Sequence, residues 1–284
     1  MTKNAALKPE LSALGKKSSY ETTYNPSLLF PISRKHNRNA LEINTDLPLP
    51  FYGYDYWNHY EVSWLNEKGK PIVALAEIIY PCHSPNIIES KSMKLYFNSL
   101  NNTHFKDSAS VQSVIKKDLA EHLDCSQVTV RVTPLNRFKQ TELLQRLKGF
   151  CLDELDITCS VYQNNIHFLK TEDEDVEEVL CSDLLKSNCL VTSQPDWCSV
   201  QIAYKGKKIN HEGLLKYLIS FRNDNEFHEQ CIEKIFMHIM QKCHPDELTV
   251  CGRSTRRGGL DINSIRSKQP VDEQTLMNMR LCRQ

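Results

Sequence analysis

The stretch LLKSNCLVTSQPDWCS, residues 184–199, carries two ionisable groups on either side of a turn, and the other motifs of the chain are best understood from it. Cys189 ends a polar run, and Asp196 follows Pro195 and precedes Trp197. A thiol and a carboxylate separated by a proline turn can converge on one small pocket. A thiolate supplies a nucleophile, and a partly buried carboxyl beside a tryptophan can stay protonated and act as an acid. The alternative stays open on spacing alone, because a lone cysteine is commonly a small buried hydrophobic residue.

Three further stretches follow the same order along the chain as a known family. They are IIESKSMK at 87–94, FHEQ at 227–230 and RRGGLD at 256–261. Together with residues 184–199 they resemble the NADPH-dependent 7-cyano-7-deazaguanine reductases, the nitrile reductases of queuosine biosynthesis, in their long two-module form. One position departs from the family, since Cys198 stands where a small residue such as glycine is expected after the tryptophan. It puts a second thiol near the first and bears on oxidation sensitivity, not on the resemblance.

Composition limits the classes of function. The 284 residues are 40% hydrophobic, enough for one large domain or two of ordinary size with a substantial core. Lys plus Arg and Asp plus Glu both total 35, so the formal charge is zero and gives no electrostatic reason for a nucleic-acid or anionic-membrane partner. Queuosine ends up in tRNA, yet we expect this chain to handle a free base without direct contact with nucleic acid.

The cysteines and the apolar runs indicate a compartment. The chain has 11 cysteines, an odd number, with no CxxC pair, which predicts reduced thiols in a cytosol and not a disulfide framework. The N-terminus has no apolar run typical of a signal peptide, and no stretch approaches the roughly 20 apolar residues of a membrane span. We therefore expect a cytoplasmic protein without membrane partners.

Periodicity predicts a related order of elements in the two halves of the chain. Residues 1–19 are expected to form a loose polar arm and residues 20–49 a mostly irregular segment. In the first half we expect strands at 60–64 and 72–80, helices at 89–101 and 110–123, and a strand at 128–132. In the second half we expect a linking helix at 140–150, an acidic loop at 171–178 and a strand at 197–204. Helices at 211–221 and 226–243 and a strand at 248–251 are expected to follow. Identities at an offset of about 120 residues are compatible with a distant duplication, and they are Lys94 with Lys216, Asn101 with Asn223, and Phe105 with Phe227.

The resemblance implies an α+β fold of two tandem tunnelling-fold (T-fold) modules, with antiparallel sheets each backed by helices. We place the N-terminal module at 20–139 and the C-terminal module, which carries Cys189, at 140–284. In this fold family the modules assemble into barrels and bind purines or pterins at their interfaces. A homodimer is therefore expected.

A helix over 226–243 would place His228 in its apolar face and Glu229 at the edge of that face, with Asn225 as N-cap. The structural alternatives are a hydrogen-bonded core histidine and a first-turn glutamate that favours the helix dipole. A guanine-like ring, however, offers adjacent N–H donors that one carboxylate can accept together. The resemblance assigns that role to Glu229. It adds contacts from Glu89 and from the backbone at Ile87 and Ile88, and it puts His228 near the reacting nitrile as a proton or orientation group.

No GxGxxG motif follows a strand, so a Rossmann cofactor site is not indicated. NADPH, which the resemblance implies, must then rest on cationic and backbone contacts. Ser90 and Lys91 at a helix start, and Arg256, Arg257 and Gly258 in a loop, offer charge, N–H donors and room for a phosphate. A surface turn is the alternative for the arginine pair. Only Cys243 and His244 are close in sequence as metal ligands, and adjacent residues rarely ligate together, so we expect no metal.

The implied reaction begins with attack of the Cys189 thiolate on the nitrile carbon of 7-cyano-7-deazaguanine. Asp196 protonates the developing nitrogen and a covalent thioimide results. Two hydrides from NADPH, with an imine between them, lead to 7-aminomethyl-7-deazaguanine. Two rival functions remain: a zinc-dependent, cyclohydrolase-like T-fold enzyme, and a non-catalytic purine-binding module in which Cys189 is structural.

Overall fold

The computed structural model describes residues 21–138, 142–190, 192–273 and 279–284, and the expected N-terminal arm at 1–19 lies outside them. The chain divides into two compact units. Among the described residues the first unit takes 21–45, 56–138 and Arg256–Asp261, and the second takes Asp46–Asp55, 142–255 and 262–284. Strands β2 (Tyr52–Leu65) and β11 (Leu260–Ser267) each contribute residues to both units.

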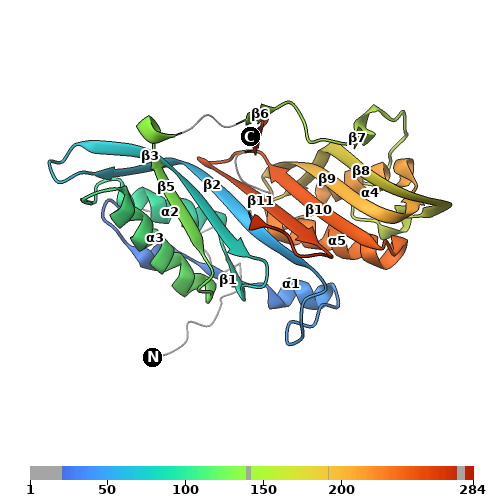
Figure 1. Cartoon of the computed structure of the whole chain (residues 1–284), viewed down its shortest axis with the longest axis horizontal. Helices are drawn as coiled ribbons and strands as arrows, with labels where there is room; N and C mark the ends of the chain where they lie inside the picture. Colours follow the sequence, from blue (N-terminus) through green and yellow to red (C-terminus); the bar gives the residue numbers. More distant parts are fainter. Residues whose placement is uncertain (1–20, 139–141, 191, 274–278) are drawn as a thin grey trace. The chain divides into compact units, whose positions relative to one another are not determined.

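The first unit is built on an antiparallel sheet in the order β5-β3-β2 (Figure 1). Helices α2 and α3 accompany it, and α3 packs against β5. A short antiparallel pair, β1 with β4, leads into α2. The remaining bounds are β1 (Pro31–Ser33), α1 (Lys35–Ala40), β3 (Pro71–Pro81), β4 (Asn86–Ile88), α2 (Ser90–Leu100), α3 (Ser108–Leu123) and β5 (Thr129–Pro134).

The second unit repeats this plan around the strand order β11-β10-β9-β8-β7. Its longest element is the antiparallel β8–β9 hairpin, and α4 and α5 pack against β8 and β10. The bounds are β6 (Glu142–Leu144), β7 (Phe150–Cys151), β8 (Thr171–Asn188), β9 (Pro195–Ile209), α4 (His211–Ser220), α5 (His228–Cys243), β10 (Glu247–Ser254) and β12 (Met279–Leu281). The predicted α+β class, with antiparallel sheets backed by helices, is confirmed. No helix among the described residues is long and apolar enough to cross a membrane.

Both units use one hydrogen-bonding scheme at the end of their first long strand. In the first unit, the Leu65 N–H donates to the Thr103 carbonyl and the Leu65 carbonyl accepts from the Phe105 N–H, both at 2.9 Å. The matching bonds in the second unit are Asn188 N–H to Asp224 O at 2.8 Å and Glu226 N–H to Asn188 O at 3.0 Å. Leu65 therefore corresponds to Asn188, and Phe105 corresponds to Glu226, one residue away from the offset that the sequence identities suggested.

The following turns correspond as well. The Asn66 N–H donates to the Lys70 carbonyl at 2.9 Å, and the Cys189 N–H donates to the Gln194 carbonyl at 2.8 Å. A proline follows each turn, Pro71 in the first unit and Pro195 in the second. The residue of the first unit that occupies the place of Cys189 is therefore Asn66.

The linking helix expected at 140–150 is wrong. Of the part that the structure describes, Glu142–Leu144 forms β6, which pairs in parallel with β12, and Phe150–Cys151 forms β7 beside β8. Gly149 has a φ of +132°, and a Cβ there would lie 2.5 Å from the Val179 carbonyl oxygen. This close approach of two strands needs a glycine and excludes a helix at that point.

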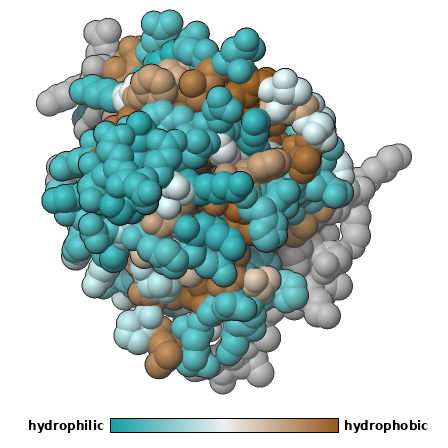
Figure 2. Space-filling view, turned by 90° about the vertical axis from the view of Figure 1, so that its right-hand side faces the viewer, coloured by the Kyte–Doolittle hydropathy of each residue, from teal (hydrophilic) through white to brown (hydrophobic). Residues whose placement is uncertain are grey.

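The acidic loop expected at 171–178 is also wrong, because these residues form the first half of β8. Their side chains are nevertheless mostly exposed, as predicted from their charge. The strand forms because β9 offers lysines opposite them: Asp175 pairs with Lys207 in the ladder, and the Lys208 ammonium lies 3.1 Å from Glu174. The end of the molecule to which this segment projects in Figure 1 faces the reader in Figure 2 and is mostly hydrophilic.

One smaller expectation also needs correction. Asn225 does not cap α5: the N-cap is Phe227, which makes no side-chain cap hydrogen bond, and Asn225 lies in a bridge to Asn188. The segment at 20–49 was expected to be mostly irregular, and its described residues are so, apart from the short elements β1 and α1 and a 3₁₀ turn at Pro26–Leu28.

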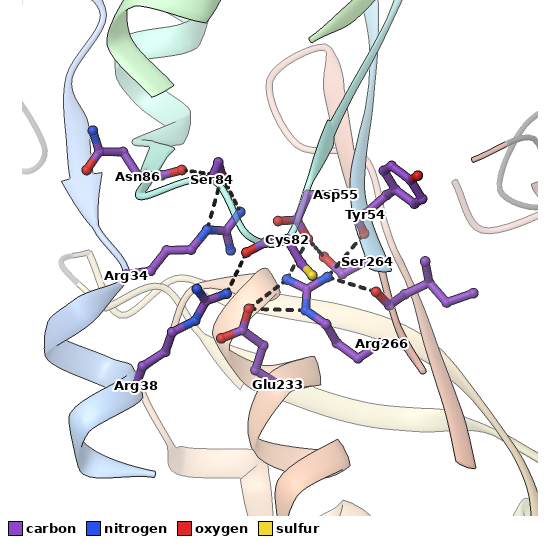
Figure 3. Close-up of polar contacts among 11 residues, drawn as sticks. Arg34, Arg38, Tyr54, Asp55, Cys82, Ser84, Asn86, Glu233, Ser264 and Arg266 are labelled. Carbon is purple, nitrogen blue, oxygen red and sulfur yellow. Dashed lines mark hydrogen bonds and ion pairs between the residues drawn. The ribbon is translucent and has the colours of Figure 1, made fainter. Parts of the chain in front are cut away.

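Each unit buries arginines that are satisfied within it (Figure 3). In the second unit the fully buried Arg266 guanidinium donates to Asp55 and Glu233, in each case at 2.9 Å. In the first unit Arg38 donates to the Cys82 carbonyl at 2.6 Å, and Arg34 donates to the Ser84 hydroxyl. Buried charges of this kind require such partners, so they fix the conformation of the backbone around them.

Candidate active site

The predicted nucleophile and acid lie at the same end of the β8–β9 hairpin. Cys189 is the first residue of the turn after β8 and is only 4% exposed. Asp196 is the second residue of β9, 7% exposed, and its partner in the ladder is Ser187, two residues before Cys189. Ser193, within the turn, has a φ of +55°, which is unusual for a residue with a side chain. The turn therefore brings the thiol-bearing and carboxyl-bearing residues to one end of the hairpin, as predicted.

The start of α5 adds two more of the predicted residues. His228 is the first residue of the helix, and its Nε2 lies 3.9 Å from Asp196 Oδ1, with the side chains 18% and 6% exposed. Glu229 follows in the first turn and is 2% exposed. The structure thus brings Asp196 together with His228, at a separation that permits an ion pair but exceeds a hydrogen bond. All four residues, Cys189 included, belong to the second unit.

Several other thiols of the second unit are held in their neutral form. Burial raises the pKa of Cys198 to about 12, and it raises the pKa of Cys181 and of Cys243 to about 11. Burial also raises the pKa of Cys231 and of Cys251 above the usual thiol value. A neutral thiol is a poor nucleophile, so these cysteines suit core positions. Cys198, which stands where the family that the sequence resembles is expected to have a small residue, belongs to this group.

The segment expected to contact the substrate through its backbone lies in the first unit. Ile87 and Ile88 are buried in β4, where they pair with Ile32 and Pro31 of β1. Glu89 follows as N-cap of α2 and is fully buried. Its two carboxylate oxygens accept the N–H groups of Lys91 at 2.6 Å and Ser92 at 2.8 Å. Burial is the largest influence on the Glu89 pKa and raises it, while these two hydrogen bonds oppose the shift.

The residues expected to hold the cofactor also gather in the first unit. Ser90 and Lys91 are the first two residues of α2, and both are partly exposed. Arg257 and Gly258 lie in the tight turn between β10 and β11, closed by a bond from the Arg257 N–H to the Leu260 carbonyl at 3.0 Å. Gly258 is exposed with a φ of +61°, a conformation that disfavours a residue with a side chain.

Lys94 connects these two pieces and was missed as a site residue. A Cβ on Gly258 would lie 2.9 Å from both Cδ and Cε of Lys94, so the lysine side chain runs along the glycine. Lys94 is three residues after Lys91, and helical residues at this spacing share a face. That spacing in the sequence could have identified it. Arg256 of the same turn lies over the Tyr60 ring, with its guanidinium carbon 3.7 Å from the centroid.

The turn is anchored to β2 by polar contacts. Asp261, 1% exposed, accepts from the Tyr60 hydroxyl at 2.6 Å and from the Asn58 amide at 2.8 Å. The Gly259 carbonyl accepts from the Tyr60 N–H and lies 2.8 Å from His59 Nδ1. Burial lowers the pKa of His59 to about 4, so its ring is neutral and donates to this carbonyl. These contacts hold a cationic turn in one conformation, as a preformed anion site requires.

Metal ligands do not cluster in the part of the chain that the structure describes. No three His, Cys, Asp or Glu side chains of these residues lie close enough together to hold an ion.

Comparison with known proteins identifies the family. A family model described as "Nitrile reductase, 7-cyano-7-deazaguanine-reductase N-term" matches residues 20–133, and one described as "QueF-like protein" matches residues 195–273. A Legionella pneumophila protein named NADPH-dependent 7-cyano-7-deazaguanine reductase is 62% identical over 275 residues, which cover 96% of this chain and 95% of that protein. The chain belongs to the 7-cyano-7-deazaguanine reductase family. The resemblance inferred from the four motifs is thereby confirmed.

Other members of the reductase family match over similar lengths. The proteins of the same name from Ralstonia nicotianae and Coxiella burnetii are 54% and 51% identical and cover 91% and 92% of this chain, and 94% and 93% of their own lengths. Among solved structures, the crystal structure of an archaeosine synthase QueF-Like in the apo form matches with 17% identity and a TM-score of 0.30. The match covers 36% of this chain and 99% of that one. The two family models match successive parts of the chain, in agreement with the predicted tandem modules.

Proposed function

We propose that this chain reduces the nitrile of 7-cyano-7-deazaguanine to the aminomethyl group of 7-aminomethyl-7-deazaguanine, with two molecules of NADPH, in queuosine biosynthesis. One observation carries the proposal. Cys189 and Asp196 lie at the same end of one hairpin, with His228 Nε2 3.9 Å from Asp196 Oδ1, in a chain 62% identical to a relative named for this activity.

In the proposed first step the Cys189 thiolate attacks the nitrile carbon. A C–S bond forms, one C–N π bond becomes a lone pair on nitrogen, and the Asp196 carboxylic acid donates a proton to that nitrogen. The product is a thioimide covalently held on Cys189. The low exposure of both residues supports this role, because water would hydrolyse such an intermediate. His228, beside Asp196, is suited to return the proton to the acid or to orient it.

Bound NADPH supplies one hydride to the substrate carbon in each of two rounds. After the first round the Cys189 sulfur leaves with the C–S bonding pair, and an imine remains in the pocket. The second hydride, together with a proton on nitrogen, gives the amine. The sum is one nitrile, two NADPH and two protons converted to one aminomethyl group and two NADP⁺.

We assign recognition of the substrate edge to Glu229, whose buried carboxylate can accept two neighbouring N–H groups of the heterocycle. Glu89 and the backbone at Ile87 and Ile88 are proposed to add contacts. Each Glu89 oxygen accepts one backbone N–H of α2, and a carboxylate oxygen has a second acceptor position. Glu89 can therefore cap α2 and bind a ligand donor together.

For NADPH we propose phosphate contacts from Ser90, Lys91, Arg257 and Gly258. The donor set fits such a group. A helix N-terminus, two cationic side chains and an exposed glycine of positive φ lie in one unit, joined by Lys94 along the glycine. Arginine suits the 2′-phosphate through its bidentate geometry.

We further propose a cytoplasmic homodimer with modules at 20–139 and 140–284 that acts on the free base and does not contact nucleic acid. The odd number of cysteines, eleven, supports the compartment, and the formal charge of zero supports the absence of nucleic-acid contact. The matched ranges of the two family models, 20–133 and 195–273, fall within these boundaries.

The function is tested by following NADPH absorbance with purified protein and the nitrile. The proposal predicts NADPH oxidation that depends on the nitrile, with two NADPH consumed per amine formed. Binding of the nitrile without NADPH oxidation would indicate the non-catalytic purine-binding alternative. Stoichiometric zinc in the purified protein, with no nitrile-dependent oxidation, would indicate the cyclohydrolase-like alternative.

A further inference from the structure

Asn188, the residue before Cys189, is held from three directions. Its backbone N–H donates to Asp224 and its carbonyl accepts from Glu226, at 2.8 and 3.0 Å. Its side-chain oxygen accepts from the Lys186 ammonium at 2.6 Å. Because a residue bonded through both backbone groups and its side chain has little freedom, the position of the Cys189 backbone is set by these contacts.

The segment that holds Asn188 also leads to the other proposed reacting groups. Residues 224–226 end immediately before Phe227, the N-cap of α5, and His228 and Glu229 follow at once. The thiol-bearing turn and the start of α5 are thus tied together by three residues of chain. Movement of residues 224–226 would therefore change the distance between the proposed nucleophile and the groups proposed to bind the substrate.

Lys186 makes a second link between the end of β8 and the segment before α5. Its ammonium donates to the carbonyl of Arg222 at 2.6 Å, in the 3₁₀ turn Phe221–Asn223 that immediately precedes residues 224–226. The Lys186 ammonium therefore links the end of β8 to the 3₁₀ turn that precedes residues 224–226. Burial is the largest influence on the Lys186 pKa and lowers it, the nearby Arg222 lowers it further, and the Asp196 carboxylate raises it. The lysine thus lies in the electrostatic environment of the proposed acid.

The first unit provides an internal comparison for this arrangement. Leu65 occupies the place of Asn188 and makes the same two backbone hydrogen bonds, with Thr103 and Phe105. The place of Lys186, two residues earlier, is taken by Ser63, so the ammonium link is missing. The backbone bonds alone therefore suffice to form this turn. The lysine link accompanies only the turn that carries the cysteine.

We propose that Lys186 is a positioning residue for the nucleophile, which it holds through Asn188 and the Arg222 carbonyl at a fixed distance from the His228–Glu229 end of α5. The proposal rests on the function proposed above for Cys189. Lys186 does not touch the substrate. It reduces the range of positions that the thiolate samples, and a misplacement of about 1 Å costs roughly 100-fold in rate.

The test is the rate of thioimide formation without NADPH, measured by quenched mass spectrometry over a series of nitrile concentrations. Lys186→Met keeps the aliphatic side chain and removes both hydrogen bonds. We expect a rate constant for adduct formation about 10- to 100-fold below that of the parent, with half-saturation by the nitrile within about threefold, because Glu229 is unchanged. The second variant, Asn188→Leu, introduces the residue of the first unit, keeps the backbone bonds and is expected to show the same defect.

Lys207→Met is the matched control. The Lys207 ammonium, also on this hairpin, donates to one backbone carbonyl, that of Asp173, and to one side-chain oxygen, that of Asp175. It is expected to form the adduct at the parent rate. Parent-like rates in both Lys186→Met and Asn188→Leu would overturn the positioning role, and so would a loss of nitrile binding equal to the loss of rate. A parent protein that forms no adduct would instead refute the proposed function itself.

Discussion

The turn after β2 and the turn after β8 are framed by corresponding backbone hydrogen bonds, although the second is one residue longer, and they differ in proposed use. In the first, Asn66 accepts the N–H groups of Lys68 at 3.0 Å and Lys70 at 2.9 Å through its side chain, and the left-handed position is taken by Gly69. Both choices stabilise a tight turn. In the second, Cys189 replaces the asparagine and Ser193 takes a left-handed conformation. The second turn therefore has neither the asparagine nor the glycine that stabilises the first turn, and a thiol lies at the position where the proposed chemistry needs one.

The strands that follow the two turns also differ, with a hydrophobic residue in the first unit and a carboxyl group in the second. Asp196, 7% exposed, stands where the first unit has Ile72, and His228 lies 3.9 Å from it. A hydrophobic residue at the start of a strand contributes to packing, whereas a buried carboxyl costs free energy unless it is partnered. In this account the turn of the first unit serves stability and the turn of the second unit serves the proposed chemistry. The substitutions below test that difference.

The largest effect is expected from exchanging the first residue of each turn for alanine. Cys189→Ala should lower kcat by roughly 10⁴-fold or more, because the covalent route is lost. Asn66→Ala should leave kcat within about twofold and lower the free energy of unfolding by about 1 kcal/mol through the lost side-chain hydrogen bonds. Steady-state NADPH oxidation and urea denaturation measure the two quantities. Similar kinetic losses in both variants would break the comparison.

Asp196→Asn comes next. The amide keeps the shape but cannot donate an acidic proton, so kcat should fall by roughly 10²- to 10⁴-fold. The fold should persist, since the register of β9 with β8 is made by the backbone. The circular dichroism spectrum and the urea midpoint check the fold. Full activity of a folded Asp196→Asn variant would remove Asp196 as the acid.

Glu229→Gln probes the binding group instead of the reacting group. Replacing a carboxylate that accepts two N–H groups by an amide should raise KM for the nitrile by roughly 10- to 100-fold, in line with about 1.5–3 kcal/mol for charged hydrogen bonds. Glu212→Gln is the control, because Glu212 is the acidic residue of the first turn of α4 and lies outside the proposed site. Equal KM values for the two variants would contradict substrate recognition by Glu229.

The smallest effect concerns the left-handed positions. Ser193→Gly should relieve strain and change the free energy of unfolding by less than about 1 kcal/mol in the stabilising direction, whereas Gly69→Ser should destabilise by about 1 kcal/mol. Thermal melts of both variants measure the difference. A strong destabilisation by Ser193→Gly would show that the serine side chain, and not the backbone, holds the second turn.

Much of this arrangement could be predicted from residue patterns. Alternation located the two strands expected at 60–64 and 72–80, although β2 already begins at Tyr52, and helical spacing located α2, α3 and α4 within two residues at their ends. The turn of Cys189 and Asp196 was visible because a proline and polar residues precede the strand expected at 197–204. The proximity of Asp196 and His228 could not be predicted from the sequence, because it depends on where α5 begins relative to the hairpin.

The failures have physical causes. The acidic run at 171–178 was expected to be a loop because its charge favours solvent, but a strand also exposes charges when lysines of the partner strand lie opposite. Asn225 has good capping chemistry, but α5 begins at His228, so the N-cap position falls on Phe227, two residues after Asn225. Lys186 carried no motif of its own. Its role became visible only when the two units could be compared bond by bond.

The central claim is a bond between the Cys189 sulfur and the nitrile carbon. Incubation of the protein with 7-cyano-7-deazaguanine, without NADPH, followed by intact mass and peptide mapping, tests it most directly. The account predicts a gain of one ligand mass, located on the peptide that contains Cys189 and lost on addition of NADPH. An unmodified protein, or a ligand mass found on any of the other ten cysteines with Cys189 unmodified, would contradict it.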